Sequence, residues 1–260
     1  MSNKTNQAES FVRLLKIMDE LREQCPWDKK QTIESIRHLT LEEVYELSDA
    51  IIEKDFENIK KELGDILLHI VFYARIASET KLFDIKDVID SICIKLVDRH
   101  PHIYGEIKVN SEEEVKQNWE KIKLREGNRS VLSGVPKGLP ALIKAQRIQE
   151  KASGVGFDWQ NKLQVWEKVK EEIRELEKEV QDAPLVNEKI EEEFGDVLFS
   201  LINYGRFLKL NPEDALEKTN QKFIKRFNYI ETKLKEKGIN FENSKLSEME
   251  FFWEEAKKLK

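Results

Sequence analysis

One helical pattern occurs twice in this 260-residue chain, and this repeat constrains its fold more than any other feature. The segment LGDIL at residues 63–67 corresponds to FGDVL at 194–198, and YAR at 73–75 corresponds to YGR at 204–206, both at an offset of 131 residues. Apolar side chains recur at helical spacing in both copies, and strand patterns are almost absent. We therefore expect an all-α fold built from two copies of one helical unit, each about 125 residues long.

The best candidate for a boundary between the copies is the segment GNRSVLSGVPKGLP at residues 127–140, where glycine and other turn-forming residues cluster. We predict an N-terminal domain at residues 1–126, a linker at 127–140 and a C-terminal domain at 141–260. The whole chain has only 10 Gly and 6 Pro, and 36% of its residues are charged. This composition favours long solvated helices, as expected for two tandem helical bundles.

Two acidic pairs flank a predicted turn in the second copy. Glu172 and Glu175 are three residues apart on one predicted helix, which places them on one helix face. Glu193 and Asp196 have the same spacing on the next helix. Pro184 marks the turn. The inner residue of each pair, Glu175 or Glu193, lies nine residues from Pro184, and the outer residue of each pair lies twelve residues from it. In an antiparallel helical hairpin, equal distances along the chain mean equal heights, so we expect the four carboxylates to face one another.

The first copy carries the same arrangement around Lys54. Glu46 and Glu62 lie eight residues on either side of Lys54, and Glu43 and Asp65 lie eleven. Four carboxylates at such close range repel one another unless a hard divalent cation, which prefers oxygen ligands, neutralises them. We therefore predict Mg²⁺, with Mn²⁺ as a substitute, at these four residues and at the four of the second copy.

Two other interpretations of the acidic pairs remain open. A single Glu-x-x-Glu pair in a chain this charged is usually part of a solvated helix face. The repetition of the pairs and their place beside apolar helix segments favour metal binding, because buried carboxylates are costly unless they are paired or metal-bound. A di-iron carboxylate bundle also uses acidic residues on four helices, but it requires Glu-x-x-His pairs, which this sequence lacks.

Two lysines lie close to the acidic pairs of the second copy. Lys168 and Lys189 each stand one helical turn before an acidic pair, where a cation suits a phosphate group. In the first copy, Leu39 and Asn58 occupy the corresponding positions, and neither is basic. We therefore expect the second copy to be the main active site.

A second basic set follows on two later predicted helices. Lys222 and Arg226 are one turn apart on one helix face, and Trp253 and Lys257 have the same spacing further on. Alone, this pattern describes a surface stripe with a half-buried tryptophan. Beside an acidic metal site, the cations suit phosphates and an aromatic ring next to a cation suits a stacked base.

Whole-chain properties exclude several classes of function. The net charge of −6 argues against a general nucleic-acid-binding protein, whose surface should be basic. No apolar run approaches the ~20 residues of a membrane span, and the polar N-terminus lacks the core of a secretion signal.

Cys25 and Cys93 are isolated, so a reduced cytoplasm is the expected location. P-loop and complete dinucleotide-binding glycine motifs are absent, which excludes these two modes of nucleotide binding.

The chain resembles the MazG family of nucleoside triphosphate pyrophosphohydrolases with tandem MazG domains. The resemblance covers nearly the whole chain and rests on both sets of acidic pairs and on several short motifs. These motifs are CPWD at 25–28, RHPH at 99–102, GVP at 134–136, RIQEKA at 147–152 and VGFDW at 155–159.

The resemblance implies an all-α homodimer that cleaves nucleoside triphosphates to nucleoside monophosphates and pyrophosphate in a Mg²⁺-dependent reaction. It also implies metal ligands at the matching carboxylates, with those of the second copy as catalytic residues. The residues that it implies around the nucleotide are Lys168, Lys189, Glu192, Lys222, Arg226, Trp253 and Lys257. Similar all-α proteins act on dUTP or phosphoribosyl-ATP, so the choice of base and sugar does not follow from the fold.

Under this hypothesis, a water activated by the metal or by a carboxylate attacks the α-phosphorus, and pyrophosphate leaves. The lysines and Arg226 neutralise charge on the phosphates. Recognition of a base by stacking is tolerant, so broad specificity for NTPs and dNTPs is expected. The alternative is a non-catalytic helical regulator that binds nucleotides or a partner protein. Such a protein would bind nucleotide without turnover, or not at all.

Overall fold

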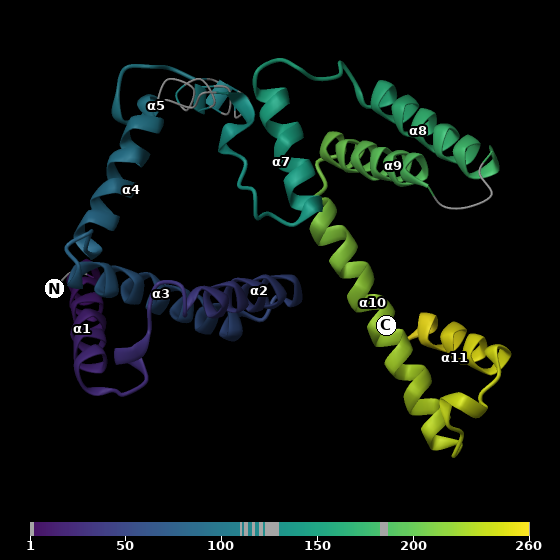
Figure 1. The fold of residues 1–260 in the computed structure, drawn as a ribbon, viewed down its shortest axis with the longest axis horizontal. Helices are drawn as coiled ribbons and strands as arrows, with labels where there is room; N and C mark the ends of the chain where they lie inside the picture. The colour runs from purple at the N-terminus through teal and green to yellow at the C-terminus, as the bar shows by residue number, and fades with distance from the viewer. Residues whose placement is uncertain are drawn as a thin grey trace. The chain divides into compact units, whose positions relative to one another are not determined.

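The computed structural model describes residues 3–109, 130–182 and 187–259 and, between the first two ranges, residues 111, 114, 115, 118, 119 and 122. All regular secondary structure in these residues is helical (Figure 1), which confirms the predicted all-α fold. The chain divides into two compact units, Met1–Asn110 and Ser111–Lys260. The linker at 127–140 stays a prediction, and its first three residues lie outside the described residues.

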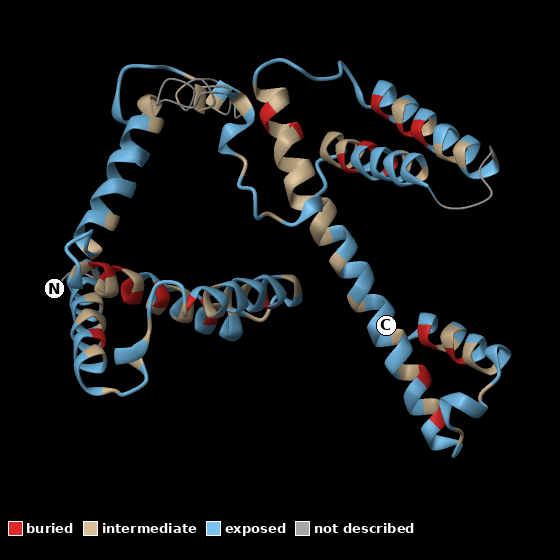
Figure 2. Ribbon diagram, viewed as in Figure 1, coloured by how far each residue is buried: buried red, intermediate tan, exposed pale blue. Residues whose placement is uncertain are grey.

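The first unit is an assembly of helices in which α1 and α2 both pack against α3. Its core joins Met18 of α1 to Ile36, Val71 and Phe72, and each of these side chains is at most 3% exposed. Figure 2 shows buried residues in α1 and α3 where the two helices meet. The elements are α1 (Asn3–Gln24), η1 (Asp28–Lys30), α2 (Arg37–Glu53), α3 (Phe56–Glu79), α4 (Ile85–Arg99) and α5 (Pro101–Tyr104).

The reversal between α2 and α3 takes only two residues. Lys54 ends α2 in the left-handed conformation, with φ of 59°, which costs a non-glycine residue roughly 1–2 kcal/mol. Asp55 then caps α3, because its side chain accepts hydrogen bonds from the backbone N–H groups of Glu57 at 3.1 Å and Asn58 at 3.2 Å. This tight turn keeps α2 and α3 antiparallel and sets the heights of the acidic pairs on them.

A network of charged side chains fastens α1 to α3. The Arg22 guanidinium donates to both carboxylate oxygens of Glu79, at 2.8 and 2.9 Å, and to the carbonyl of Gln31 at 3.0 Å. Arg75 donates to Asp19 of α1 at 2.7 Å. The hydrogen bond from Arg22 lowers the pKa of the Glu79 carboxyl below its ordinary value. The network therefore holds α1, the end of α3 and the segment around η1 together.

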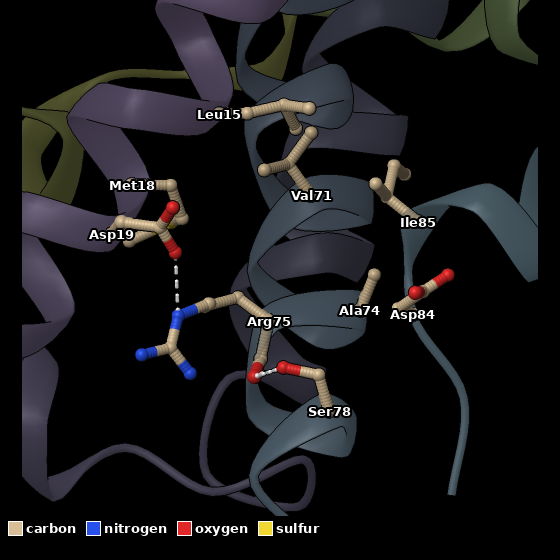
Figure 3. Close-up of a pocket in the computed structure, with 9 residues that line it drawn as sticks. All are labelled: Leu15, Met18, Asp19, Val71, Ala74, Arg75, Ser78, Asp84 and Ile85. Atoms are coloured by element: carbon tan, nitrogen blue, oxygen red, sulfur yellow. Dashed lines mark hydrogen bonds and ion pairs between the residues drawn. The ribbon is translucent and has the colours of Figure 1, made fainter. Parts of the chain in front are cut away.

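A small cavity of about 170 Å³ lies beside the Asp19–Arg75 ion pair, where α1, α3 and the start of α4 meet. Figure 3 shows the Asp19 carboxylate and the Arg75 guanidinium pointing toward one another along one side of it. Ser78 and Asp84 are the other polar residues of its lining. Its apolar lining consists of Leu15, Met18, Val71, Ala74 and Ile85.

The second unit is organised around the packing of α8 against α9, with α7 also against α9 and α11 against α10. Val165 and Val169 of α8 are at most 1% exposed, and Val197 of α9 is 9% exposed. A separate apolar cluster of Ile230, Leu234 and Phe252 joins α10 to α11. The elements are η2 (Val131–Gly134), α7 (Ala141–Gly154), α8 (Lys162–Asp182), α9 (Glu188–Phe207), α10 (Pro212–Glu236), η3 (Phe241–Asn243) and α11 (Leu246–Lys258).

The turn between α8 and α9 agrees in position with the sequence pattern. Helix α8 ends at Asp182, and Asn187 caps α9 by accepting a hydrogen bond from the N–H of Ile190 at 3.1 Å. Pro184, the predicted turn residue, lies outside the described residues.

The repeat extends to one structural ion pair. Arg206, which corresponds to Arg75 at the offset of 131, donates to both oxygens of Asp158 at 2.5 and 2.8 Å. In each unit, an arginine on the later helix thus binds an aspartate from the segment before the hairpin. Among the described helices, none is both long and apolar enough to cross a membrane.

Candidate active site

Three carboxylates of the second unit converge between α8 and α9. One oxygen from each of Glu172, Glu175 and Glu193 lies within 4.8 Å of the others. The spacing of three residues places the first two on one face of α8, and the packing of α9 brings Glu193 opposite them. Glu172 is only 7% exposed. We call these three residues the second acidic group.

The fourth predicted ligand of this unit, Asp196, is exposed and lies outside that 4.8 Å group. Its charge nevertheless reaches the group. Desolvation raises the pKa of Glu193 above its ordinary value, and the charges of Glu175, Asp196 and Glu172 raise it further. A carboxylate that is held among other negative charges gains most from a bound cation.

Lys168 of α8 lies against the second acidic group. Its ammonium is 2.7 Å from carboxylate oxygens of both Glu171 and Glu172. Hydrogen bonds to these two carboxylates raise the pKa of Lys168 above its ordinary value, so it stays charged. This predicted phosphate contact therefore also supplies the positive partner of the buried Glu172.

The other predicted nucleotide contacts lie on α9, α10 and α11. Lys189 and Glu192 are exposed in the first turns of α9, and Lys222 is exposed on α10. The remaining three are Arg226, Trp253 and Lys257, on α10 and α11.

The Arg226 guanidinium stands 5.5 Å from the centre of the Trp253 ring, a cation–π contact. Trp253 also packs against Phe223, with ring centres 5.1 Å apart, and against the cluster that joins α10 to α11. Lys257 pairs with Glu254 at 2.6 Å. Among the described residues, no hydrogen bond or ion pair joins this set to the second acidic group. The structure thus brings Arg226 and Trp253 together, but it does not bring them onto the carboxylates.

The first unit holds a matching set, which we call the first acidic group. One oxygen from each of Glu43, Glu46 and Glu62 lies within 4.8 Å of the others. Desolvation raises the pKa of Glu43, and the nearby charges of Asp65, Glu46 and Glu62 add to the increase. Asp65 itself lies outside the 4.8 Å group, as Asp196 does in the second unit.

Glu62 is the most buried carboxylate of either group, at 3% exposed. Its Oε2 atom has no hydrogen-bond partner, and its Oε1 atom is 3.0 Å from the Lys61 ammonium. A buried charged oxygen without a partner is costly unless a cation can approach it. The donor sets of both groups, made of carboxylate oxygens alone, therefore fit a hard divalent cation such as Mg²⁺.

Sequence patterns missed two charged residues that interact with these groups or with their lysine partner. Glu171 and Glu172 both form an ion pair with Lys168. The sequence of α8 is so rich in charged residues that it does not single out Glu171 for this contact. Lys61 could have been found from the repeat. It corresponds to Glu192 at the offset of 131 residues, so the first copy has a basic residue where the second has an acidic one.

Comparison with known proteins agrees with this geometry. Residues 31–104 and 160–230 each match the MazG nucleotide pyrophosphohydrolase domain, so the matched segments include both acidic groups. The fold and the site therefore define a tandem all-α protein with a carboxylate group in each copy. The chain belongs to the MazG nucleotide pyrophosphohydrolase family.

Relatives match along almost all of the chain. A nucleoside triphosphate pyrophosphohydrolase of Escherichia coli K12 is 42% identical over 253 residues, which are 95% of this chain and 96% of the relative. The nucleoside triphosphate pyrophosphohydrolase/pyrophosphatase MazG of Thermotoga maritima is 44% identical over 95% of each chain. The uncharacterized protein YabN of Bacillus subtilis is 46% identical, and the match covers 95% of this chain but 51% of that protein.

Proposed function

We propose that this protein is a nucleoside triphosphate pyrophosphohydrolase that depends on a divalent cation and cleaves the bond between the α- and β-phosphates. The observation that carries the proposal is the convergence of Glu172, Glu175 and Glu193 within 4.8 Å on a helical hairpin of the second unit. Family membership and the names of relatives that match along the whole chain support the substrate class. The products would be a nucleoside monophosphate and pyrophosphate.

The second acidic group, with Asp196 beside it, would hold Mg²⁺, and Mn²⁺ would substitute because it also accepts carboxylate oxygens. When bound, the cation would neutralise the carboxylates and polarise the triphosphate. We place the main site in the second unit because Lys168 and Lys189 have no basic counterparts at Leu39 and Asn58.

The protein's own groups would divide the remaining work. A carboxylate of the second acidic group would take a proton from the attacking water, whose oxygen forms a bond to the α-phosphorus. The bond from the α-phosphorus to the bridging oxygen then breaks, and pyrophosphate leaves with that oxygen. Lys189, Lys222 and Arg226 would bind the phosphates and balance the charge that develops on the leaving group. Trp253, half-buried under Arg226, would support the base or pack beneath it.

The test is to incubate the purified protein with each NTP and dNTP and Mg²⁺ and to separate the products by anion exchange. We expect monophosphate and pyrophosphate from several bases, and no reaction after EDTA treatment. Diphosphate and orthophosphate would instead mean that the wrong bond was assigned. Nucleotide binding without turnover, with either Mg²⁺ or Mn²⁺, would favour the alternative of a non-catalytic regulator.

We further propose a homodimer in the cytoplasm, where nucleoside triphosphates are made and used. Phe194, Leu198 and Leu201 follow one another at helical spacing along α9 and are 42–55% exposed. This exposed apolar stripe supports the proposed dimer interface. Sedimentation velocity should give twice the mass of one chain, and Leu198→Asp should shift the protein toward monomer. A wild-type monomer at micromolar concentration would contradict the proposal.

A further inference from the structure

The two acidic groups differ in charge at the position that directly precedes the glutamate on the second helix of each hairpin. Glu62 and Glu193 correspond at the offset of 131 residues, and the residue before each is Lys61 in the first unit and Glu192 in the second. At this one position, a positive charge in the first unit therefore corresponds to a negative charge in the second.

Lys61 lies on the first acidic group itself. Its ammonium is 3.0 Å from Oε1 of Glu62, whose side chain is 5% exposed, while the Lys61 side chain is 63% exposed. The hydrogen bond to Glu62 and the charge of Glu62 raise the pKa of this ammonium above its ordinary value, and the charges of Asp65 and Glu46 add to the increase. Lys61 is therefore a cation held among the carboxylates that a metal ion would use, on a side chain with room to leave.

The second acidic group also has a lysine in contact, since Lys168 lies 2.7 Å from Glu172, but more negative charge surrounds it. Glu192 adds a negative charge next to Glu193 and contributes to its raised pKa. The lysine of this group, Lys168, is shared between Glu172 and Glu171, and the latter lies outside the group. The second group thus keeps a larger excess of negative charge for a divalent cation to neutralise.

We propose that Lys61 is the resident cation of the first acidic group, so that the residue at this position decides which unit takes up a divalent cation first. The unpartnered Oε2 atom of buried Glu62 leaves a position for a metal ion, but only against the repulsion of the Lys61 ammonium. The first group is therefore a weak metal site and the second a tight one. The inference deepens the proposed function, because it rests on the two groups being metal sites, but it does not require turnover.

The test is direct binding of Mn²⁺ to the full chain without nucleotide, measured by electron paramagnetic resonance of the free ion. We expect two classes of site whose affinities differ by about tenfold or more, given the repulsion between unit charges within ~4 Å. Glu62→Gln should remove the weak class and Glu175→Gln the tight one. Lys61→Glu introduces the residue found at this position in the second unit. It should raise the Mn²⁺ affinity of the weak class to within a few-fold of that of the tight class.

Lys60→Glu is the matched control. Lys60 precedes Lys61 on α3, has a side chain 73% exposed, and pairs with exposed Glu57 rather than with the acidic group. This variant changes the net charge by the same amount as Lys61→Glu, and it should leave both classes unchanged. Circular dichroism should show that all variants are folded.

Equal shifts from Lys60→Glu and Lys61→Glu would overturn the proposal, since a general charge effect would then suffice. Two equally tight classes in the wild-type protein would also overturn it. The result is separate from the proposed function, since the protein could bind Mn²⁺ in this pattern and still fail to hydrolyse nucleotides. Glu192→Lys gives a second, reciprocal readout, because it should weaken the tight class by about tenfold.

Discussion

Replacing Glu175 by glutamine is expected to reduce kcat by at least about a hundredfold. Loss of a hydrogen-bond partner outside a metal's direct ligands typically costs 10–100-fold in activity or metal affinity, and a direct ligand should cost at least as much. Glu175 is exposed, and the substitution changes its charge but hardly its size, so the fold should be unaffected. Steady-state release of pyrophosphate from dATP or ATP with Mg²⁺ measures the loss.

The first unit supplies the matched control for this substitution. Glu46 corresponds to Glu175 at an offset of 129, is also exposed, and also has an oxygen in a 4.8 Å group. Glu46→Gln should change kcat by less than about threefold. The reason is that the first unit has Leu39 and Asn58 at the positions of the two phosphate-binding lysines proposed for the second unit. Equal losses in the two variants would mean that both units react, and full activity of Glu175→Gln would remove the second acidic group from the mechanism.

The second large effect is expected at Lys222, where Lys222→Ala should raise KM for the nucleotide about tenfold or more. A hydrogen bond to a charged group contributes ~1.5–3 kcal/mol, which corresponds to a factor of about ten to a hundred in affinity. Lys222 is exposed on α10, so its removal should not disturb the core. Kinetics over a range of ATP concentrations, with free Mg²⁺ held constant, separate KM from kcat.

Lys235→Ala is the control for this substitution. Lys235 has the same charge and is exposed on the same helix, but it lies thirteen residues further along, about 20 Å at the rise of an α-helix. Its KM should stay within about twofold of the wild-type value. The same increase in both variants would indicate general attraction of an anionic substrate, and no increase at Lys222 would exclude α10 from the nucleotide site.

The sequence was sufficient to predict which glutamates approach one another, but it did not show that Asp65 and Asp196 lie outside the two 4.8 Å groups. Helical rise is uniform, so equal distances from Lys54 place Glu46 and Glu62 at one height, and both belong to the 4.8 Å group of the first unit. The helices and the repeat followed for the same reason, because both rest on local periodicity.

Burial and long-range pairing could not be predicted in this way. Glu62 is 3% exposed although its apolar neighbour Leu63 is 52% exposed, the reverse of what their polarity suggests. The packing of α2 on α3 decides this, and one helix alone carries no signal of it. The Arg22–Glu79 pair likewise joins residues 57 positions apart, which local patterns do not connect.

The most direct test of the central claim is hydrolysis of ATP in water enriched in oxygen-18, followed by mass spectrometry of both products. If water attacks the α-phosphorus at the second acidic group, the heavy oxygen should appear in AMP and not in pyrophosphate, and the reaction should disappear in Glu175→Gln. Heavy oxygen in pyrophosphate would mean attack at the β-phosphorus. Undiminished labelling of AMP by Glu175→Gln would place the reaction elsewhere in the protein.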